Sequence, residues 1–461
     1  MQKRYINLEL WDNAYNGHYL LAVFHCVPKD EHMDFLDIAT EVAAESSTWS
    51  NIRVKTATVF SDTMNALIYK IDKEKNLVWM AYPTRMFDRG WNIQNIFTYI
   101  AGNIYGMWNL SALKLLDVWF PPAFLENYDG PNYTLDDMRA YLDVYDRPIL
   151  WTIIKPKMWL TASEYAEVCY DYWSGGGDFV KNDEPQADQD FCPYEHMVHN
   201  VKEAMDKAVA ETGRKKVHSF NVSSPDFDEM IRRCELIRET FEPWSYAFLV
   251  DGLTAGWMAV QTVRRRYPDV FLHFHRAWHG AYTRPENPFG FSVTVLSKFA
   301  RLAGASGMHT WTAGIGKMEW NISEDVTAAN EILFVKAQGH FFSQERWKIP
   351  QQDKDWINLV KEDSLHHLVL ENDAWRGVKK TSPIISGWLN PLKLKPFVDA
   401  IGHVDFITTM GGGVHAHPGG THAGAKAQAQ AGEALQKWID IHEYAKDHKE
   451  LAQAIEFYSD K

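Results

Sequence analysis

The sequence has few cysteines, and none of them form a pattern that binds metal. Its four cysteines, Cys26, Cys169, Cys192 and Cys234, lie far apart and include no C-x-x-C pair. This spacing argues against both a disulfide framework and a cysteine zinc site. We therefore expect four buried, reduced thiols.

Basic residues and long apolar runs are also scarce. The net charge of −13 has the wrong sign for a protein that binds the phosphate backbone of nucleic acids. No stretch approaches the roughly 18 uninterrupted apolar residues that would span a membrane, and the first residues lack the apolar region of a signal peptide. We expect a cytoplasmic protein without nucleic-acid or membrane partners.

The second part of the chain carries repeated strand-like and helix-like segments. The 461 residues are enough for two or three domains. Short apolar runs alternate there with amphipathic stretches such as 163–173, 194–212, 226–240 and 330–342, as in repeated βα units. Eight such strands predict a closed parallel (β/α)8 barrel. The runs cover residues 149–155, 178–181, 217–222, 247–251, 270–275, 307–310, 382–386 and 404–409.

The first part of the chain has a different pattern. Strand-like stretches at 19–27, 53–60 and 66–71 are mixed with helix-like stretches at 34–44 and 93–101. This pattern predicts a separate α+β domain of the ferredoxin-like kind over residues 1–145. The barrel and the C-terminal helices, including one expected at 441–457, would then occupy residues 146–461.

Ionisable groups gather at the predicted strand ends, where barrels of this class place their active sites. In the segment 178–184, Lys181 and Asp183 are two residues apart and would face the same side, with Glu184 following as the strand ends. Two carboxylates beside a lysine suit a Mg²⁺ site, and a CO2 molecule captured by the amine would add a third oxygen ligand. A plain salt bridge is the alternative.

Other strand ends offer groups that could hold a phosphorylated ligand. One phosphate could be bound by cationic or hydrogen-bond-donating side chains, namely His275, Arg276, His279 and His309. A second phosphate could be bound by the backbone N–H groups of Gly411 and Gly412. Ser386 and Gly387 would lie between them, and Lys155 or Lys157 could donate a proton. Each has an ordinary structural alternative: a satisfied polar histidine, a glycine loop, or solvated lysines.

Several motifs together resemble the large chain of ribulose-1,5-bisphosphate carboxylase/oxygenase (RuBisCO), in particular its form II/III archaeal-type subgroup. The resemblance covers essentially the whole chain. The GGDFxKNDEP string is its most specific part. The motifs are AESST at 44–48, TIIKPK at 152–157, GGDFVKNDEPQ at 176–186, HRAxHG at 275–280, GKME at 316–319 and GGGVHAHPGG at 411–420.

The resemblance implies a set of catalytic roles. Lys181 would be carbamylated by CO2 and would bind Mg²⁺ with Asp183 and Glu184. The carbamate would remove the C3 proton of ribulose-1,5-bisphosphate to give an enediolate, and the products would be 3-phosphoglycerates, with O2 competing with CO2. His275 would relay protons, Lys317 would close over the site, and Lys155, tuned by Lys157, would protonate the final carbanion.

The resemblance also implies how the substrate and a second subunit contribute. Arg276 and His309 would hold one phosphate, with His279 beside them, and Ser386 with Gly387 would contact the substrate between its ends. Glu45 and Asn103 would come from the neighbouring subunit, so a homodimer or an oligomer of dimers is expected, without a small subunit. The family's positions for the other phosphate are occupied by Ser50, Trp388, Gly411 and Gly412.

Tryptophan is unusually frequent, with 19 residues against 20 tyrosines. At nine positions the family pattern has glycine where this chain has tryptophan, and such bulk near the site would impair catalysis. Because a single residue type replaces glycine every time, we interpret these sites as UGA codons that the source reads as glycine; a repacked pocket is the alternative. The positions are Trp49, Trp108, Trp151, Trp159, Trp278, Trp311, Trp320, Trp388 and Trp438.

Two other functions stay open at this point. A RuBisCO-like enolase or isomerase of sulfur salvage shares the barrel and the carbamate, but it usually lacks part of the carboxylase set, which is present here. The other alternative is a chain that folds and dimerises but is catalytically impaired by its tryptophans.

Overall fold

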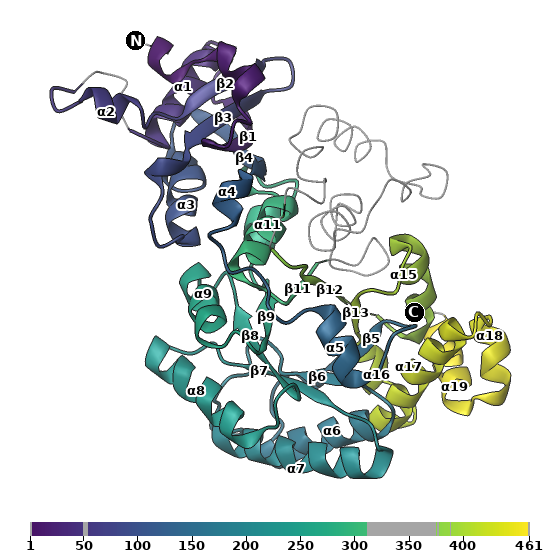
Figure 1. The fold of residues 1–461 in the computed structure, drawn as a ribbon. Coiled ribbons are helices and arrows are strands. Elements are labelled where there is room, and N and C mark those ends of the chain that lie inside the picture. The colour runs from purple at the N-terminus through teal and green to yellow at the C-terminus, as the bar shows by residue number, and fades with distance from the viewer. Residues whose placement is uncertain (1, 49–53, 311–374, 376–377, 388, 460–461) are drawn as a thin grey trace.

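Two sheets organise the chain in the computed structural model (Figure 1). The structure describes residues 2–48, 54–310, 375, 378–387 and 389–459. The first sheet lies in the N-terminal region, and the second is a closed barrel of eight parallel strands. The predicted combination of an α+β part and a (β/α)8 barrel is confirmed.

The N-terminal sheet has the order β10-β4-β1-β3-β2. Neighbours among β1 to β4 are antiparallel, and α1 and α3 connect β1 to β2 and β3 to β4, which is the ferredoxin-like arrangement. The bounds are β1 Tyr19–Pro28, α1 Phe35–Glu45, α2 Val59–Asp62, β2 Leu67–Asp72, β3 Leu77–Pro83, α3 Ile93–Ile100 and β4 Leu110–Trp119.

One strand of this sheet comes from the second half of the chain. β10 (Phe289–Phe291) pairs in parallel with β4. Directly after it, Lys298 on α11 (Val293–Ala303) forms an ion pair with Asp117 on β4, and both side chains are buried. The barrel region and the N-terminal sheet are therefore joined by backbone hydrogen bonds and by a buried charge pair.

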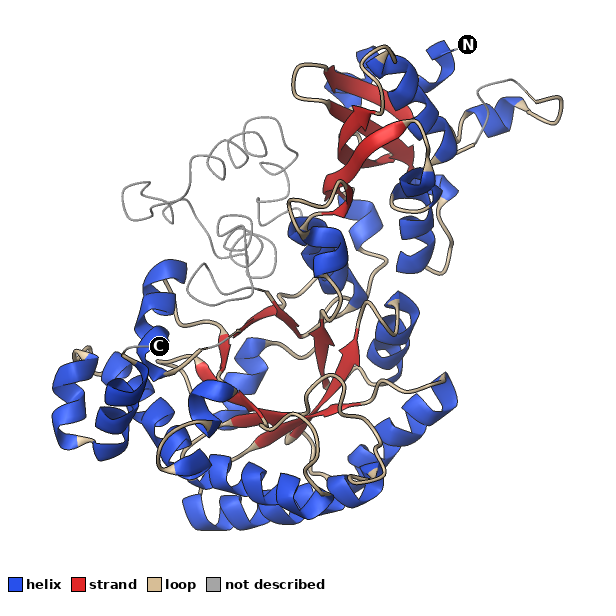
Figure 2. Cartoon of the chain, turned by 180° about the vertical axis from the view of Figure 1, so that it is seen from behind, coloured by secondary structure: helices blue, strands red, loops and turns tan. Residues whose placement is uncertain are grey.

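Eight parallel strands close the barrel in the order β11-β12-β13-β5-β6-β7-β8-β9. Helices surround the closed sheet (Figure 2). The strands are β5 Ile149–Ile153, β6 Phe179–Lys181, β7 Val217–Asn221, β8 Tyr246–Asp251, β9 Phe271–His275, β11 Gly307–His309, β12 Ser382–Ser386 and β13 Ile407–Thr409.

Helices of the barrel begin at ordinary capping residues. Thr161 and Glu164 form a capping box at the start of α6, and Asp226 caps α8 through the Glu229 amide. Besides α11, the described α-helices after β5 are α6 Ala162–Ser174, α7 Tyr194–Thr212, α8 Phe227–Thr240, α9 Trp257–Arg266, α10 Gly280–Thr283, α15 Leu394–Ile401, α16 Gly412–His415, α17 Gly420–Gln436, α18 Ile441–Tyr444 and α19 Lys449–Tyr458.

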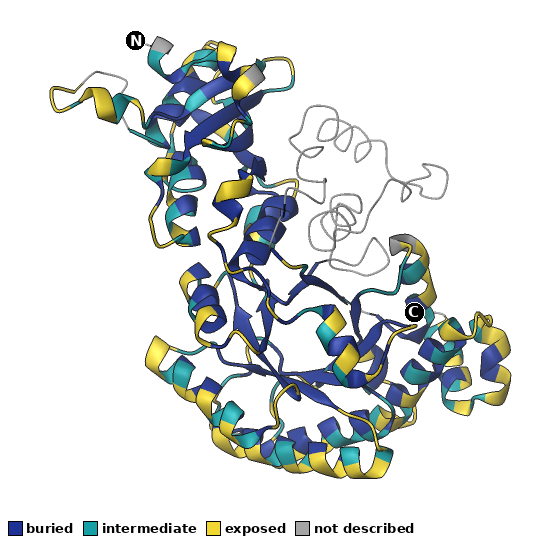
Figure 3. Cartoon of the chain, in the orientation of Figure 1, coloured by how far each residue is buried: buried dark blue, intermediate teal, exposed yellow. Residues whose placement is uncertain are grey.

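A second apolar core fills the barrel. Helix α5 (Leu135–Leu142) covers this core at the end of the barrel where the strands begin. Trp151 on β5 and Phe179 on β6 are register partners, and their rings stack at 4.0 Å. Figure 3 shows the barrel strands and the N-terminal sheet as buried and the outer faces of the helices as exposed. The barrel is therefore a packed core, and its polar groups gather at one rim.

Some sequence expectations are wrong in detail. The strand expected at 53–60 is absent from its described residues, because Thr58 and Ser61 form a capping box that starts the short helix α2. The single helix expected at 441–457 breaks at Ala445–Asp447 into α18 and α19. Strands β3 and β4 were not expected; β3 is buried along its whole length, so it lacks the alternation of a half-exposed strand. The helix expected at 330–342 lies outside the described residues.

All four cysteines are buried and unpaired, as expected. Burial raises the pKa of the Cys26 thiol to about 12, which keeps this thiol protonated and unreactive. Within the described residues, every helix is too short or too polar to span a lipid bilayer.

Candidate active site

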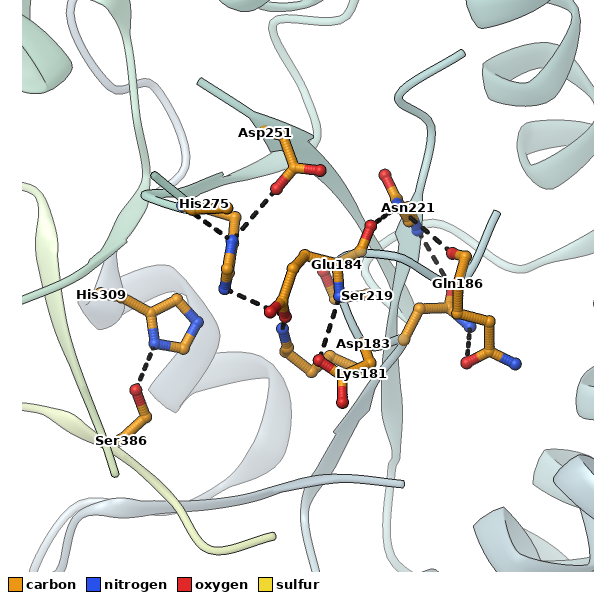
Figure 4. A network of polar contacts seen from close by, with 12 residues as sticks. Lys181, Asp183, Glu184, Gln186, Ser219, Asn221, Asp251, His275, His309 and Ser386 are labelled. Atoms are coloured by element: carbon orange, nitrogen blue, oxygen red, sulfur yellow. Dashed lines mark hydrogen bonds and ion pairs between the residues drawn. The ribbon is translucent and has the colours of Figure 1, made fainter. Parts of the chain in front are cut away.

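The rim of the barrel brings together the final residues of five strands. Because parallel strands end at one rim, polar side chains that are far apart in sequence become neighbours there (Figure 4). These final residues are Lys181 of β6, Asp251 of β8, His275 of β9, His309 of β11 and Ser386 of β12.

Lys181 is fully buried, and its Nζ has no hydrogen-bond partner among the described residues. The nearest carboxylate oxygen that forms an ion pair with it is Glu184 Oε2, at 3.8 Å. Burial lowers the pKa of the Lys181 amine, although Glu184 and Asp183 oppose that shift. A lowered pKa makes the neutral, nucleophilic amine more available.

Asp183 and Glu184 follow Lys181 in a loop, not on the strand, because β6 ends at Lys181. The sequence expectation that strand alternation orients Asp183 is therefore wrong, yet both carboxylates lie beside Lys181 (Figure 4). Burial and the neighbouring Glu184 raise the pKa of Asp183. Burial would also raise the pKa of Glu184, but Asp183, His275 and Lys181 together lower it.

Lys155 and Lys157 also lie in a loop, because β5 ends at Ile153, two residues earlier than expected. Lys155 Nζ donates a hydrogen bond to Asp183 Oδ2. Lys157 is exposed on the same loop. The structure therefore brings Lys155 into the site directly, while Lys157 stays at its edge.

His275 lies between two carboxylates. Its Nδ1 is 3.1 Å from Asp251 Oδ1, and its Nε2 is 3.4 Å from Glu184 Oε2. A carboxylate beside one ring nitrogen helps to fix the orientation of an imidazole. The contact with Asp251 therefore aims the other nitrogen of His275 toward the site.

The neighbouring polar groups are the buried His309, the partly buried His279 and an arginine. His309 Nδ1 is 2.8 Å from Ser386 Oγ, and burial together with His273 and His275 lowers the pKa of His309 well below its usual range. His279 Nδ1 is 2.8 Å from Thr283 Oγ1, and burial lowers the His279 pKa to about 2. Arg276, also buried, follows β9 directly.

The glycine loop after β13 approaches the site closely. A Cβ on Gly413 would lie 1.9 Å from the Leu389 carbonyl oxygen, and one on Gly411 would lie 3.3 Å from Lys155 Cε. A Cβ on Gly412 would meet nothing within 4 Å. Gly413 is required for packing, whereas the backbone at Gly412 faces space that a ligand could fill. Gly387, next to Ser386, has a φ of +123°.

The remaining predicted residues lie elsewhere. Glu45 ends α1 and Asn103 begins the 3-10 helix Asn103–Gly106; the Asn103 Nδ2 to Glu45 Oε1 distance is 3.5 Å. Figures 1 and 2 show α1 in the N-terminal sheet domain, away from the barrel of the same chain. Ser50, Lys317 and Trp388 lie outside the described residues.

Two residues near the site were not in the predicted set. Asp251 contacts His275, as described above. His273, buried inside the barrel, is 3.2 Å from Ser219 Oγ through its Nδ1, and its ring centroid is 4.8 Å from that of His309. The alternation of His273 and His275 on one strand was the signal that both face the barrel axis.

The donor set fits a hard cation only in part. Among the described residues, no group of three or more histidine, cysteine, aspartate or glutamate side chains is arranged to hold a metal ion. Asp183 and Glu184 provide two carboxylates, whereas Mg²⁺ prefers about six oxygen ligands. The buried amine of Lys181, beside these carboxylates and without a hydrogen-bond partner among the described residues, is the group that could gain a further anionic oxygen.

Two family models match the chain. The ribulose bisphosphate carboxylase large chain, catalytic domain, matches residues 134–353 and 348–458. The N-terminal domain of the same large chain matches residues 9–124. The chain belongs to the RuBisCO large-chain family.

Curated RuBisCO relatives match over nearly the full length. A protein from Rhodopseudomonas palustris (strain HaA2), named ribulose bisphosphate carboxylase, is 41% identical over 470 residues, covering 99% of this chain and 95% of the relative. One of the same name from Rhodobacter capsulatus is 39% identical over 467 residues, again covering 99% and 95%.

Solved RuBisCO structures share the fold. The dimeric archaeal Rubisco from Hyperthermus butylicus superposes with a TM-score of 0.83 at 34% identity, covering 98% of each chain. The octameric enzyme from Pyrococcus horikoshii OT3 in complex with sulfate gives a TM-score of 0.83 at 28% identity, covering 99% of this chain and 96% of that chain. The match therefore extends from sequence to three-dimensional fold.

Proposed function

We propose that the chain is a ribulose-1,5-bisphosphate carboxylase that also accepts O2. In carboxylation, one CO2 and one water join the bisphosphate, which splits into two molecules of 3-phosphoglycerate. The observation that supports this most directly is Lys181, an amine buried at a strand end beside Asp183 and Glu184 without a hydrogen-bond partner among the described residues. The names of the full-length relatives support the same reaction.

Lys181 would activate the site by reacting with CO2. Its neutral amine would form an N–C bond to the gas and release one proton, giving a carbamate; burial favours the neutral amine. The carbamate, Asp183 and Glu184 would hold Mg²⁺. When bound, the ion would supply positive charge that stabilises developing oxyanions.

Protons would move through the neighbouring side chains. The carbamate on Lys181 would remove the C3 proton of the substrate to leave an enediolate. His275, oriented by Asp251, would exchange protons with the substrate hydroxyls through Nε2. Lys155 Nζ, beside Asp183, would protonate the final carbanion, with Lys157 tuning it.

The two phosphates would lie on opposite sides of the rim. Arg276, His279 and His309 would hold one of them; Arg276 and His309 are buried, and buried donors gain strength from the low dielectric constant. Ser386 and Gly387 would contact the substrate between its ends, with Lys317 closing over it. The other phosphate would lie at Ser50, position 388, Gly411 and Gly412.

A second copy of the chain would complete the site. Glu45 and Asn103 belong to the domain that we propose for residues 1–145, and they lie away from the barrel, proposed as residues 146–461. We therefore propose a homodimer, or a higher oligomer of dimers without a small subunit, in the cytoplasm. Dimeric and octameric archaeal Rubiscos are among the structural neighbours.

Incorporation of labelled CO2 tests the proposal. The printed chain and a version with glycine at the nine family-glycine positions are incubated with ribulose-1,5-bisphosphate and Mg²⁺. We expect acid-stable labelled 3-phosphoglycerate from at least the glycine version. Absence of product from both, with both folded, would contradict the proposal and favour the salvage-type enolase or isomerase.

A matched pair of lysine variants links that product to Lys181. Lys181→Met in the active background should abolish labelling. Lys216→Met is the control, because Lys216 is also a buried lysine, and burial lowers its pKa to about 8. Lys216 directly precedes β7, so it lies at the opposite end of that strand from the site, where its Nζ donates to the Gly177 carbonyl. Labelling that survives in Lys181→Met would exclude the carbamate.

A further inference from the structure

Tryptophan dominates the non-glycine residues with positive φ. The described part of the chain holds seven such residues, and five of them are tryptophan. Tryptophan makes up only 19 of the 461 residues of the chain. Asn76 and Asp143 are of the types that commonly adopt this conformation, whereas a bulky side chain there is an outlier. The other five are Trp91 (φ 54°), Trp159 (φ 79°), Trp244 (φ 77°), Trp278 (φ 75°) and Trp438 (φ 56°).

Trp438 occupies the glycine position of a Schellman motif. After α17, the Trp438 N–H donates to Leu435 O at 3.1 Å, and the Ile439 N–H donates to Ala434 O at 3.0 Å. This pair of hydrogen bonds defines the motif, whose left-handed residue is usually glycine. The indole of Trp438 is 92% exposed, so packing offsets little of the strain.

The same motif ends α11, and there the chain does use glycine. The Gly304 N–H donates to Arg301 O at 3.1 Å, and the Ala305 N–H donates to Ala300 O at 3.0 Å. Gly304 has a φ of +98°. The two helix ends have the same hydrogen bonds and differ in the residue at the left-handed position.

Trp244 occupies the glycine position of a tight turn. The Ser245 N–H donates to Glu242 O at 3.1 Å, which makes Pro243 and Trp244 the two central residues. The proline ring holds φ negative at the first central residue, and φ is +77° at the second. That combination is a type II turn, in which Pro-Gly is the favoured central pair.

Trp278 repeats this arrangement at the rim of the barrel. The His279 N–H donates to Arg276 O at 3.0 Å, with Ala277 and Trp278 between them. Ala277 is not among the positive-φ residues, so Trp278 takes the second central position with a φ of +75°. A type II turn again requires glycine there.

The other two positions have weaker local signals. Trp159 is 80% exposed, and its ring stacks on Phe191. Trp91 is partly buried and packs edge-on against Phe124 and Tyr128, so it is the position where packing offsets most strain. Neither backbone is one that tryptophan prefers.

We propose that the native protein carries glycine at positions 91, 159, 244, 278 and 438. Three of these belong to the family-glycine set identified from the sequence. Positions 91 and 244 do not, and only their backbone conformation reveals them. One cause accounts for all five: the source reads as glycine a codon, UGA, that the printed sequence renders as tryptophan.

Peptides of the native protein test the proposal directly. The protein is isolated from its source, and mass spectrometry reads the residues at positions 91 and 244, with the gene sequenced in parallel. We expect the mass of glycine at both positions and a UGA codon at each. Tryptophan in either peptide, or UGG at either codon, would overturn the proposal for that position.

The recombinant chain provides a second test that does not depend on activity. Each of the five tryptophans is replaced once by glycine and once by alanine. Glycine relieves a positive φ and alanine does not, so the glycine variant should melt higher than the alanine variant, by on the order of 1–2 °C per position.

Trp11 is the matched control for this series. It lies in the 3-10 helix Leu8–Asn13 without a positive φ, and its exposure of 44% is close to the 45% of Trp244. There the order should reverse, with the glycine variant melting lower than the alanine variant. Equal or reversed order at Trp244 and Trp438 would show that their backbones do not demand glycine. That outcome would leave the carboxylase proposal unaffected.

Discussion

At the level of single residues, Lys181 combines a cost in stability with the chemical role that we propose for it. Its amine is fully buried without a hydrogen bond among the described residues, which disfavours the folded state. Lys181→Met should therefore leave the unfolding midpoint unchanged or higher while carboxylation falls below detection. Urea unfolding and labelled CO2 incorporation measure the two effects. A clear loss of stability would mean that the lysine is structural.

We propose that Asp251 acts through His275. Replacing it by asparagine keeps the size of the side chain but removes the charge 3.1 Å from His275 Nδ1. A carboxylate beside the imidazole helps to hold the ring in place, and loss of such a supporting group commonly costs about 10- to 100-fold in activity, so we expect kcat for carboxylation to fall by roughly that factor. KM for the bisphosphate should change less, because Asp251 positions a proton-transfer group rather than a phosphate. Asp228→Asn, exposed on α8, is the control. Equal kcat in both variants would remove Asp251 from the mechanism.

Among the structural elements, β4 and α11 depend on the buried Lys298–Asp117 pair. Lys298→Met would leave the Asp117 carboxylate buried without that partner, at a cost of about 3–5 kcal/mol. The double variant Lys298→Met with Asp117→Asn should recover a large part of that loss. Urea unfolding of the two single variants and the double variant measures the coupling. Additive losses would show that the pair does not hold the two elements together.

For the whole molecule, histidines that are buried or partly buried contribute to the loss of stability in acid. Burial lowers the pKa of His218 to about 3, of His279 to about 2 and of His415 to about 4, against 6.5 for a free histidine. As the pH falls below 6.5, the unfolded chain binds protons that the folded chain does not. Each histidine then removes about 1.4 kcal/mol of stability per pH unit, down to its own folded pKa.

The free energy of unfolding should therefore fall between pH 6.5 and pH 4.5 and stay nearly level above pH 7.5 as far as these groups are concerned. His218→Gln should make the slope of unfolding free energy against pH shallower by about 1.4 kcal/mol per pH unit, the contribution of one proton. The substitution also alters the contact of His218 Nε2 with Tyr165 OH. Urea titrations at several pH values measure the slope. An unchanged slope in the variant would show that His218 titrates alike in both states.

Much of the architecture could be predicted because its signals are local. Most barrel strands are short runs that end in a polar or ionisable residue, as with Val217–Asn221 and Phe271–His275; β5, which ends at Ile153, is the exception. The failures came where local signals mislead. Thr58 and Ser61 turn an apparent strand into a helix start, and the wholly buried β3 has no alternation to detect.

The residues of the candidate site could be proposed from the sequence, but their contacts could not. The motif around Lys181 identified the lysine and both carboxylates. That Lys155 would reach Asp183, and that Asp251 would orient His275, depends on which strands become neighbours and where each ends. The expectation that alternation orients Asp183 failed because β6 stops at Lys181.

The order of residues was thus enough for the barrel, the residue types at its rim and the excess of tryptophan, because strand and helix patterns and sequence motifs depend on neighbours along the chain. Barrel closure decided which of those groups touch, since it brings together side chains that are dozens of residues apart. Backbone angles likewise exist only in the folded chain. For that reason Trp91 and Trp244 were ordinary residues in the sequence and became exceptional only when their φ values were known.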